Sequence, residues 1–314
     1  MENVKKHNPF WEIIGTNTRF DFVRLMKPAL LASLAFIVLG IASIVWHGGL
    51  NMGIDFAGGT LVQIKFQRAT EADDIRKALQ PLGVDNAIIQ PYGQNEVVVR
   101  IGETGSAKEL ASRMEAALAT ALGKGTFEIR RVEMVGPKVG RDLTQKALLA
   151  ILFAWAGILV YVGIRFEFRY ALGGILALVH DVLITVGAMS LMNKEFDLNI
   201  VAALLTIVGF SINDTIVIFD RIRENARKNT RMSLTEVINL SVNQTLSRTI
   251  LTSLTVLLVL FVLFLFGGAV IHDFTFALLV GTFAGVYSTV FIASPIVLVF
   301  ERIKPSGLKR RKPA

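Results

Sequence analysis

Six long apolar stretches constrain the fold of this chain more than any other feature of its sequence. A helix rises about 1.5 Å per residue, so about 20 mostly apolar residues are needed to cross a hydrocarbon core of about 30 Å. Charged residues make up 18% of the 314 residues, whereas a soluble domain has about 25%. We therefore predict an α-helical membrane protein with six transmembrane helices, at residues 29–47, 146–164, 170–192, 198–219, 249–270 and 274–300.

The distribution of lysine and arginine predicts the orientation of these helices. The N-terminal segment 1–28 carries five of them, and the connection at residues 221–231 carries another five. On the other side, the connection between the third and fourth stretches has Lys194 alone. Short basic connections stay in the cytoplasm. We therefore expect both termini to be cytoplasmic, with residues 301–314 as a basic cytoplasmic tail.

The net charge of +8 does not by itself indicate a nucleic-acid-binding protein. The basic residues lie beside the apolar stretches and in the C-terminal tail, where anionic lipids are the simpler partner. The chain has no cysteine, which excludes disulfides, thiolate metal sites and cysteine nucleophiles. No cluster of residues has metal-ligand spacing, so we expect no metal and no cofactor. The first apolar stretch is longer than that of a signal peptide, so we interpret it as a retained anchor.

The long connection at residues 48–145 has the patterns of a separate domain. Its predicted strands cover residues 61–66, 87–90, 97–101 and 127–135, and its predicted helices cover residues 71–80 and 106–122. Thr70 is the expected N-cap of the first helix, and Ser106 with Glu109 forms a capping box for the second. The order βαββαβ is that of an α+β, ferredoxin-like fold. Long connections are translocated largely regardless of charge, so we expect this domain to be periplasmic.

Asp214 is the strongest candidate for a functional residue, because it lies inside the fourth apolar stretch. An ionisable group at membrane depth costs about 2.5–3.5 kcal/mol on insertion scales, and it is normally turned towards a bundle interior and given a partner. The alternative is that Asp214 lies at the headgroup level as an anchor. The polar neighbours Asn213 and Thr215 argue against simple exposure to lipid.

Arg248 is the candidate partner of Asp214, near the start of the fifth stretch at a comparable depth. A guanidinium favours the carboxylate form of a nearby acid, and proton binding could break the pair. The alternative is an arginine that reaches up to the headgroups.

A second polar pair, His180 and Asp181, lies near the middle of the third stretch. Histidine titrates near neutrality and can relay protons. A structural hydrogen bond between helices explains the pair equally well.

The glycine-rich segment 53–60 lacks the spacing of a phosphate-binding loop, and no phosphate-binding lysine follows it. Its glycines permit tight turns before the first strand, and Asp55 is expected to stabilise such a turn. The domain contains no nucleophile with a base and no paired carboxylates, so we do not expect an enzyme.

Several motifs resemble those of the SecF members of the SecD/SecF family, in the resistance–nodulation–division superfamily. They are Gly53-Ile-Asp-Phe-Ala-Gly-Gly-Thr60, Val135-Gly-Pro-Lys-Val-Gly-Arg-Asp-Leu143, Ala177-Leu-Val-His-Asp-Val182, the segment 209–225 around Asp214, and Ser247-Arg-Thr-Ile-Leu-Thr-Ser253. The resemblance covers roughly residues 20–300. It implies a half-transporter in the bacterial cytoplasmic (inner) membrane, and it matches Asp214 and Arg248 to residues of a proton pathway.

The resemblance also implies partners and an activity. The chain would pair with SecD, act with the SecYEG channel on unfolded preproteins, and use the proton-motive force to promote late steps of export. Two alternatives stay open: a proton-driven exporter of small molecules or lipids from the same superfamily, and a scaffold subunit. The outer domain is smaller than those of drug exporters, and the buried acid argues against a scaffold.

Overall fold

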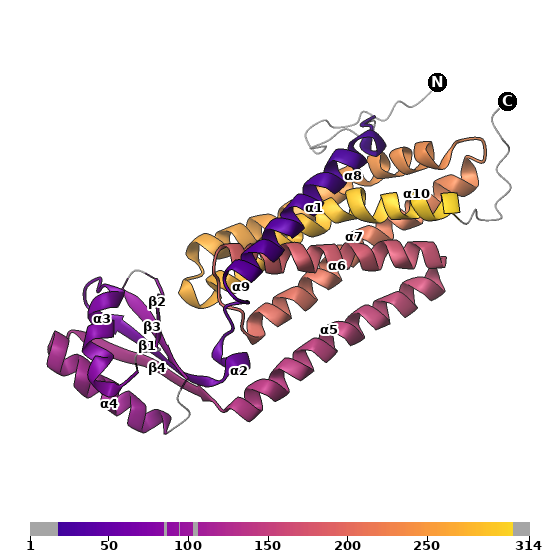
Figure 1. Cartoon of the computed structure of the whole chain (residues 1–314). Helices are drawn as coiled ribbons and strands as arrows, with labels where there is room; N and C mark the ends of the chain where they lie inside the picture. The colour runs from indigo at the N-terminus through magenta and orange to yellow at the C-terminus, as the bar shows by residue number, and fades with distance from the viewer. Residues whose placement is uncertain (1–17, 85–86, 94, 103–105, 304–314) are drawn as a thin grey trace.

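The structure, a computed structural model, describes residues 18–84, 87–93, 95–102 and 106–303 (Figure 1). A bundle of long helices carries a small α/β domain at one end. The first turn of α1 and the last turn of α10 lie at the opposite end of the bundle. We call these two ends the domain end and the termini end.

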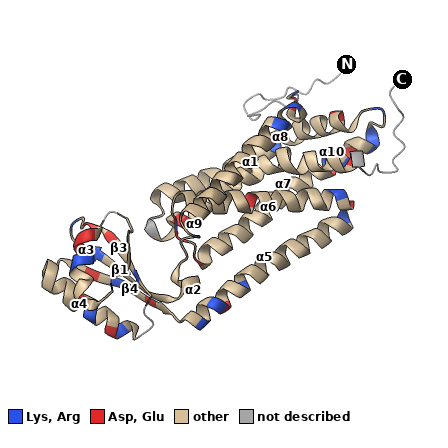
Figure 2. Cartoon of the chain, in the orientation of Figure 1, with Lys and Arg blue, Asp and Glu red and all other residues tan. Residues whose placement is uncertain are grey.

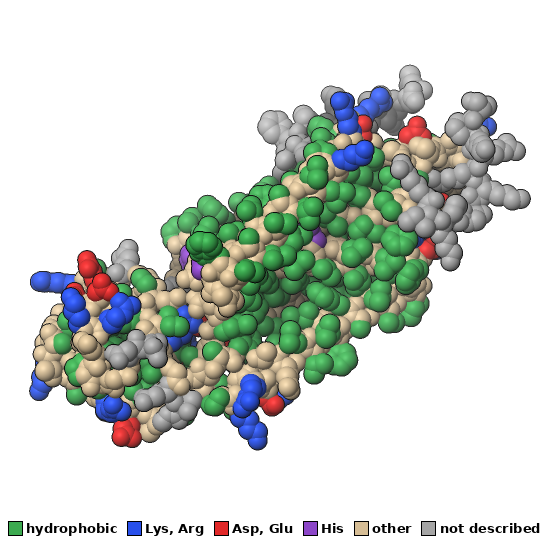
Figure 3. Space-filling model, in the orientation of Figure 1, with side chains coloured by type: hydrophobic (Ala, Val, Ile, Leu, Met, Phe, Trp, Pro, Cys, Tyr) green, Lys and Arg blue, Asp and Glu red, His purple; other side chains and the backbone are tan. Residues whose placement is uncertain are grey.

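The described residues form six helices that are long and apolar enough to cross a membrane, as the sequence predicts. Five are continuous: α1 (Phe22–Trp46), α5 (Pro137–Arg165), α6 (Phe168–Leu191), α7 (Leu198–Lys228) and α8 (Leu234–Phe266). The sixth runs from α9 (Ala269–Ser288) through a π-helical turn, η3 (Thr289–Ala293), into α10 (Ser294–Ile303). Figure 3 shows apolar side chains covering the middle of the bundle, and Figure 2 shows charged residues mainly at its ends and on the domain.

The helices extend beyond the apolar stretches from which the spans were predicted. Helix α1 begins inside the expected segment 1–28, and α5 begins at Pro137 instead of residue 146. Helix α8 likewise begins at Leu234, well before the expected start of the fifth span at residue 249, and it is one continuous helix from that residue. Its capping box of Ser233 and Glu236 is complete. Hydropathy marks the part of a helix that lipid surrounds, whereas caps and prolines mark where the helix begins and ends.

Burial divides the six helices into two groups. About half of the most apolar part of α6 (50%), α7 (50%) and the sixth helix (56%) is buried, compared with 17% in α1 and α8 and 6% in α5. Small residues bring α1 and α6 together, since a Cβ added at Gly40 would lie 2.7 Å from the Cα of Gly187. Helices α6, α7 and α9 therefore form the centre of the bundle.

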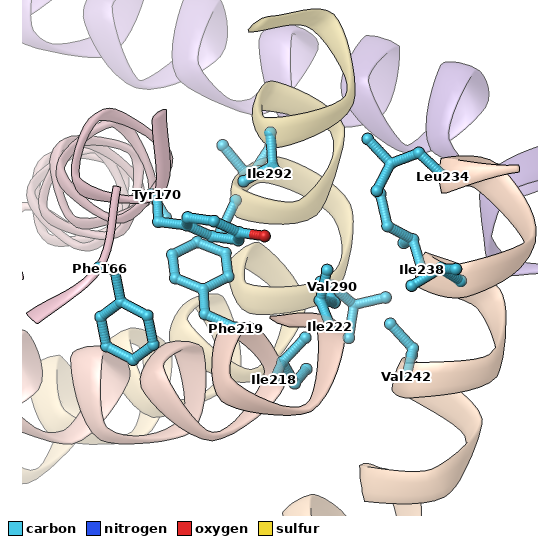
Figure 4. Packing of buried hydrophobic residues seen from close by; sticks show 14 of the residues in the cluster. Phe166, Tyr170, Ile218, Phe219, Ile222, Leu234, Ile238, Val242, Val290 and Ile292 are labelled. Carbon is cyan, nitrogen blue, oxygen red and sulfur yellow. The ribbon is translucent and has the colours of Figure 1, made fainter. Parts of the chain in front are cut away.

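An apolar cluster closes the bundle towards the termini end (Figure 4). Tyr170 of α6 packs edge-on against Phe219 of α7, with ring centroids 5.0 Å apart. Val290 of η3 and Ile238 of α8 join the same cluster. The interior here is apolar and close-packed. The cluster therefore holds the helices at fixed spacing on the termini side of the polar site described next.

The small domain is a four-stranded antiparallel sheet with two helices on one face. Its elements are β1 (Gly59–Phe66), α3 (Ala72–Leu79), η2 (Gln80–Leu82), β2 (Ile88–Pro91), β3 (Glu96–Ile101), α4 (Ala107–Leu122) and β4 (Phe127–Val135). The strand order is β2-β3-β1-β4. Alternate residues of the strands, such as Ile64 and Val99, pack against Met114 and Leu118 of α4. The short helix α2 (Ile54–Ala57) joins α1 to β1.

One expected cap is wrong and another is confirmed in part. The N-cap of α3 is Glu71, one residue after the expected Thr70, and no side chain caps it. The hydroxyl of Ser106 accepts a hydrogen bond from the Glu109 backbone, which is half of the expected capping box.

Candidate functional site

Asp181 lies at the centre of a polar network in the middle of the bundle. Its side chain is fully buried, and its Oδ1 lies 2.9 Å from Nδ1 of His180. Its Oδ2 accepts hydrogen bonds from the hydroxyls of Ser211 on α7 (2.6 Å) and Ser288 on α9 (2.9 Å). A carboxylate with its acceptor sites used in this way is well satisfied inside a membrane protein.

His180 extends the network to α1. Its Nε2 lies 3.0 Å from the Ser33 hydroxyl, and its ring stacks on Tyr287 with centroids 6.0 Å apart. The Tyr287 hydroxyl in turn donates to the carbonyl of Ala29 (2.5 Å). The network therefore ties α1, α6, α7 and α9 together, and it supports the structural interpretation of the His180–Asp181 pair.

Close packing of α7 and α9 makes these contacts possible. A Cβ added at Gly285 would lie 3.0 Å from Cβ of Ser211, so a larger residue there would require its neighbour to move by a few tenths of an ångström. One turn further on, the hydroxyls of Thr215 and Thr289 lie 3.0 Å apart. Thr289 begins the π-helical turn η3, and such turns occur frequently at functional sites.

Asp214 lies next to Thr215 on α7 but in different surroundings. It is 5% exposed, and its Oδ2 is buried without a hydrogen-bond partner. The hydroxyl of Thr249 on α8 lies near it without the geometry of a hydrogen bond, and the hydroxyls of Thr249 and Ser253 are themselves buried and unpartnered. Asp214 and Thr249 are therefore both unsatisfied where α7 meets α8, which is rare in a buried interior.

Arg248 does not form the direct ion pair with Asp214 that the sequence suggested. No such pair joins the two within the part of the chain that the structure describes, although Arg248 is close enough for a Coulomb interaction. Successive residues on a helix point about 100° apart, so Thr249 faces Asp214 while Arg248 points into a groove. Asn213, likewise one position from Asp214, is exposed.

The groove that contains Arg248 lies between α5, α7 and α8 and has a volume of about 410 Å³. Its other charged lining residues are Arg165, Asp220, Arg221 and Glu224. The Arg248 side chain therefore lines a polar groove, close to an acid with an acceptor oxygen that has no partner.

Sequence reasoning missed Ser33, Ser211, Ser288, Tyr287 and Thr249. Single serines and threonines are common in transmembrane helices, and nothing in one sequence shows which of them face one another. Gly285 was a signal in the sequence for the close packing of α9 against α7 near this network.

Comparisons with known proteins agree on one family. A model described as protein export membrane protein SecD/SecF, C-terminal, matches residues 114–303, and a model of the SecD/SecF GG motif matches residues 44–70. Protein translocase subunit SecF of Magnetococcus marinus is 48% identical over 90% of this chain and 93% of that protein. Protein translocase subunit SecF of Calditerrivibrio nitroreducens is 42% identical over 94% and 98%.

Two solved structures of SecDF are similar as well. The crystal structure of SecDF, a translocon-associated membrane protein from Thermus thermophilus, superposes with a TM-score of 0.85 at 35% identity. SecDF in a super-membrane-facing form gives a TM-score of 0.68 at 36% identity. In both cases the match covers 92% of this chain, which spans about 40% of the length of those SecDF chains.

Proposed function

This chain belongs to the SecD/SecF family of protein-export membrane proteins, and we propose that it is an accessory subunit of the Sec translocase that uses the proton-motive force to promote late steps of export. Its relatives are translocase subunits, so the chain is a transport component rather than an enzyme. It is a multi-pass protein of the inner membrane. The relatives favour this function over a small-molecule or lipid exporter.

The observation that carries the proton coupling is the unsatisfied carboxylate of Asp214. An acid inside a membrane-spanning helix is costly and is usually retained for function. Asp214 is buried, and its Oδ2 lacks a hydrogen-bond partner although Thr249 is close by. A buried carboxylate of this kind is stabilised when it binds a proton or when a donor moves within hydrogen-bond distance of it. Each response would change the packing of α7 against α8.

The proposed step is a change in the α7–α8 contact. When Asp214 is ionised, it attracts the hydroxyl of Thr249 and the guanidinium of Arg248, so α8 is drawn towards α7. When Asp214 is protonated, that attraction falls and α8 is released. Helix α7 itself stays in place, because the Asp181 network fixes it to α6 and α9. We assign His180, Asp181 and Thr215 to this fixed side, and Asn213 to the exposed face beside Asp214.

The charges support an orientation with both termini in the cytoplasm. Arg165, Arg169 and Arg221 lie at the termini end, where Figure 2 shows most of the blue colour of the bundle. By the positive-inside rule this end faces the cytoplasm and binds anionic lipids. The domain of residues 48–145 is then periplasmic. Its element order and its strand order β2-β3-β1-β4 support a ferredoxin-like fold.

A SecD subunit is the expected partner of this chain, since the similar solved structures are of SecDF. Helix α5 is 6% buried in its most apolar part, and Asn213 and Arg248 are exposed beside the acid. One acid and one cation are too few for a proton pathway across about 30 Å of hydrocarbon. SecD would supply the remaining polar residues of that pathway. The SecYEG channel and unfolded preproteins complete the proposed machinery.

Asp214→Asn tests this function. The variant mimics the protonated form at nearly constant volume, so the protein should insert, assemble with SecD and lose gradient-driven stimulation. The assay is late-stage translocation into inverted vesicles with and without a proton gradient. Asp220→Asn is the matched control on the same helix, at an exposed position near the termini end. Full stimulation in the Asp214 variant would make Asp214 an interfacial anchor and refute the proposed coupling.

A further inference from the structure

The sheet of the small domain has one face covered by α3 and α4. Its opposite face is attached to the bundle through a buried arginine. Val99 and Ile101 of β3 face the domain core, so Arg100 between them points to the opposite face. Its side chain is 5% exposed. It donates to the carbonyl of Met52 (3.1 Å), to Oδ1 of Asn51 (3.0 Å) and to Oε1 of Gln90 (2.6 Å).

The charge partner of Arg100 comes from the connection between α6 and α7. Oε1 of Glu195 lies 3.3 Å from the guanidinium, and its side chain is 24% exposed. The fit is close, since a Cβ added at Gly53 would lie 2.7 Å from the same oxygen. Nε of Arg100 is buried without a partner. The guanidinium is therefore only partly satisfied, and Glu195 is its one ion-pair partner within the residues that the structure describes.

The same connection is fastened to the segment that leads into the domain. The Phe196 backbone donates to Asn51 (2.8 Å) and accepts from Gly53 (2.9 Å). Asp55 of α2 accepts a hydrogen bond from the first amide of α7, at Leu198 (3.0 Å). Asp55 was expected to stabilise a turn before the first strand, but this hydrogen bond joins it to a helix that is distant in the sequence. This segment is fixed to the bundle, whereas the sheet reaches the connection through the Arg100 side chain.

Water can enter this junction. A pocket of about 510 Å³ lies between the sheet and the domain end of the bundle, and Glu195 lines it. The pocket is rich in acids, with Asp55, Glu133, Asp197 and Asp273 also in its lining. Burial raises the pKa of Glu195, and Arg100 opposes that rise. Burial likewise raises the pKa of Asp197.

We propose that Arg100 positions the outer domain on the bundle through Glu195, and that acid on the domain side releases this contact. Protonated Glu195 no longer balances the buried guanidinium, so the sheet swings away and Arg100 reaches the water of the pocket. The proposal rests on the proposed function for its physiological meaning, because the proton-motive force makes the periplasm the acidic side. The domain would then be held against the bundle when the periplasm is neutral, and it would be released when the periplasm is acidic.

The charges around Glu195 favour release at mildly acidic pH. A raised pKa means that Glu195 takes up its proton at a higher pH than an exposed glutamate does. Asp197, Asp273 and Asp55 act in the same direction by repulsion. Lys194 is engaged with Asp273 at 2.6 Å. The remaining titratable or charged groups at the junction are Tyr92, whose pKa is raised to about 12 by burial, Arg131, Glu133 and His272.

A single cysteine at Val98 reports the position of the sheet, because the chain has no native cysteine. Val98 is 5% exposed and lines the pocket. A cysteine at Ile88, on β2 and 49% exposed, corrects for the effect of pH on the reagent. We expect the labelling rate at Val98, relative to Ile88, to rise about tenfold in the reconstituted full chain when pH falls from about 7.5 to about 5.5.

Two variants should remove the pH dependence. Glu195→Gln and Arg100→Gln should each give the fast labelling at both pH values, and the double variant should add nothing further. Arg131→Gln is the matched control, since Arg131 lines the same pocket and pairs with Glu133 instead. It should keep the pH response of the parent. A cysteine at Leu61, also in the pocket lining, replaces Val98 if that variant folds poorly.

Slow labelling in both Glu195→Gln and Arg100→Gln, or a pH response that survives them, would overturn this proposal. Such a result would leave the Asp214 coupling intact, because export stimulation is measured separately. Conversely, Asp214→Asn with full stimulation would refute the coupling while the labelling result still decides the role of Arg100.

Discussion

Asp181 and Asp214 are two buried carboxylates in one bundle, and they differ in what surrounds them. Asp181 accepts from Ser211 and Ser288 and pairs with His180, so its oxygens are satisfied by three helices. Asp214 has an oxygen with no partner. A satisfied buried group holds helices in one arrangement, whereas an unsatisfied one makes the arrangement depend on its protonation. Depth in the membrane alone therefore does not distinguish a structural acid from one that changes its protonation.

The largest loss of stability should follow removal of Asp181. Asp181→Ala deprives His180, Ser211 and Ser288 of their shared acceptor and leaves a cavity at the centre of the bundle. We expect a loss of about 2 kcal/mol or more in the free energy of unfolding. Thermal unfolding of the purified protein in detergent measures it. An unchanged midpoint would show that the network does not hold the helices together.

A smaller loss should follow Gly285→Ala, which pushes α9 away from Ser211. The added Cβ meets Cβ of Ser211 at 3.0 Å and its Cα at 3.4 Å, so Ser211 must move by a few tenths of an ångström. We expect a cost of about 1 kcal/mol or more. Gly209→Ala is the matched control, because a Cβ there meets nothing within 4 Å. Equal effects of the two substitutions would contradict the close-packing argument.

The smallest effect on stability should come from Asp214→Asn. The carboxylate oxygen that lacks a partner has no hydrogen bond to lose, and a neutral amide costs less to bury than a charge. We expect a change of less than about 1 kcal/mol in the same unfolding experiment. A loss as large as that of Asp181→Ala would show that Asp214 is a structural residue too.

The sequence predicted the architecture because each transmembrane helix needs about 20 apolar residues and each carries its own signal. The start of α8 at Leu234 does have a local signal in the sequence, the capping box of Ser233 and Glu236. The sequence did not predict that α8 continues through the membrane, because helix continuity beyond an apolar stretch leaves no mark in hydropathy.

The candidate site was predicted less completely, because side-chain pairing depends on helix rotation. Asp214 could be identified from depth alone. Its facing residue could not, since Arg248 and Thr249 are neighbours in sequence but point about 100° apart. The partners of Asp181 come from helices far apart in the chain, and packing brings them together. The contact of Arg100 with Glu195 joins two separate regions for the same reason.

The most direct test of the contrast is infrared difference spectroscopy of the reconstituted chain with its SecD partner, between neutral and acidic pH. Protonation of a buried carboxylate produces a carbonyl band that an amide at the same position cannot produce. We predict a band that disappears in Asp214→Asn and persists in Asp181→Asn. A band that disappears in Asp181→Asn and persists in Asp214→Asn would contradict the account, because Asp181 would then be the group that changes its proton.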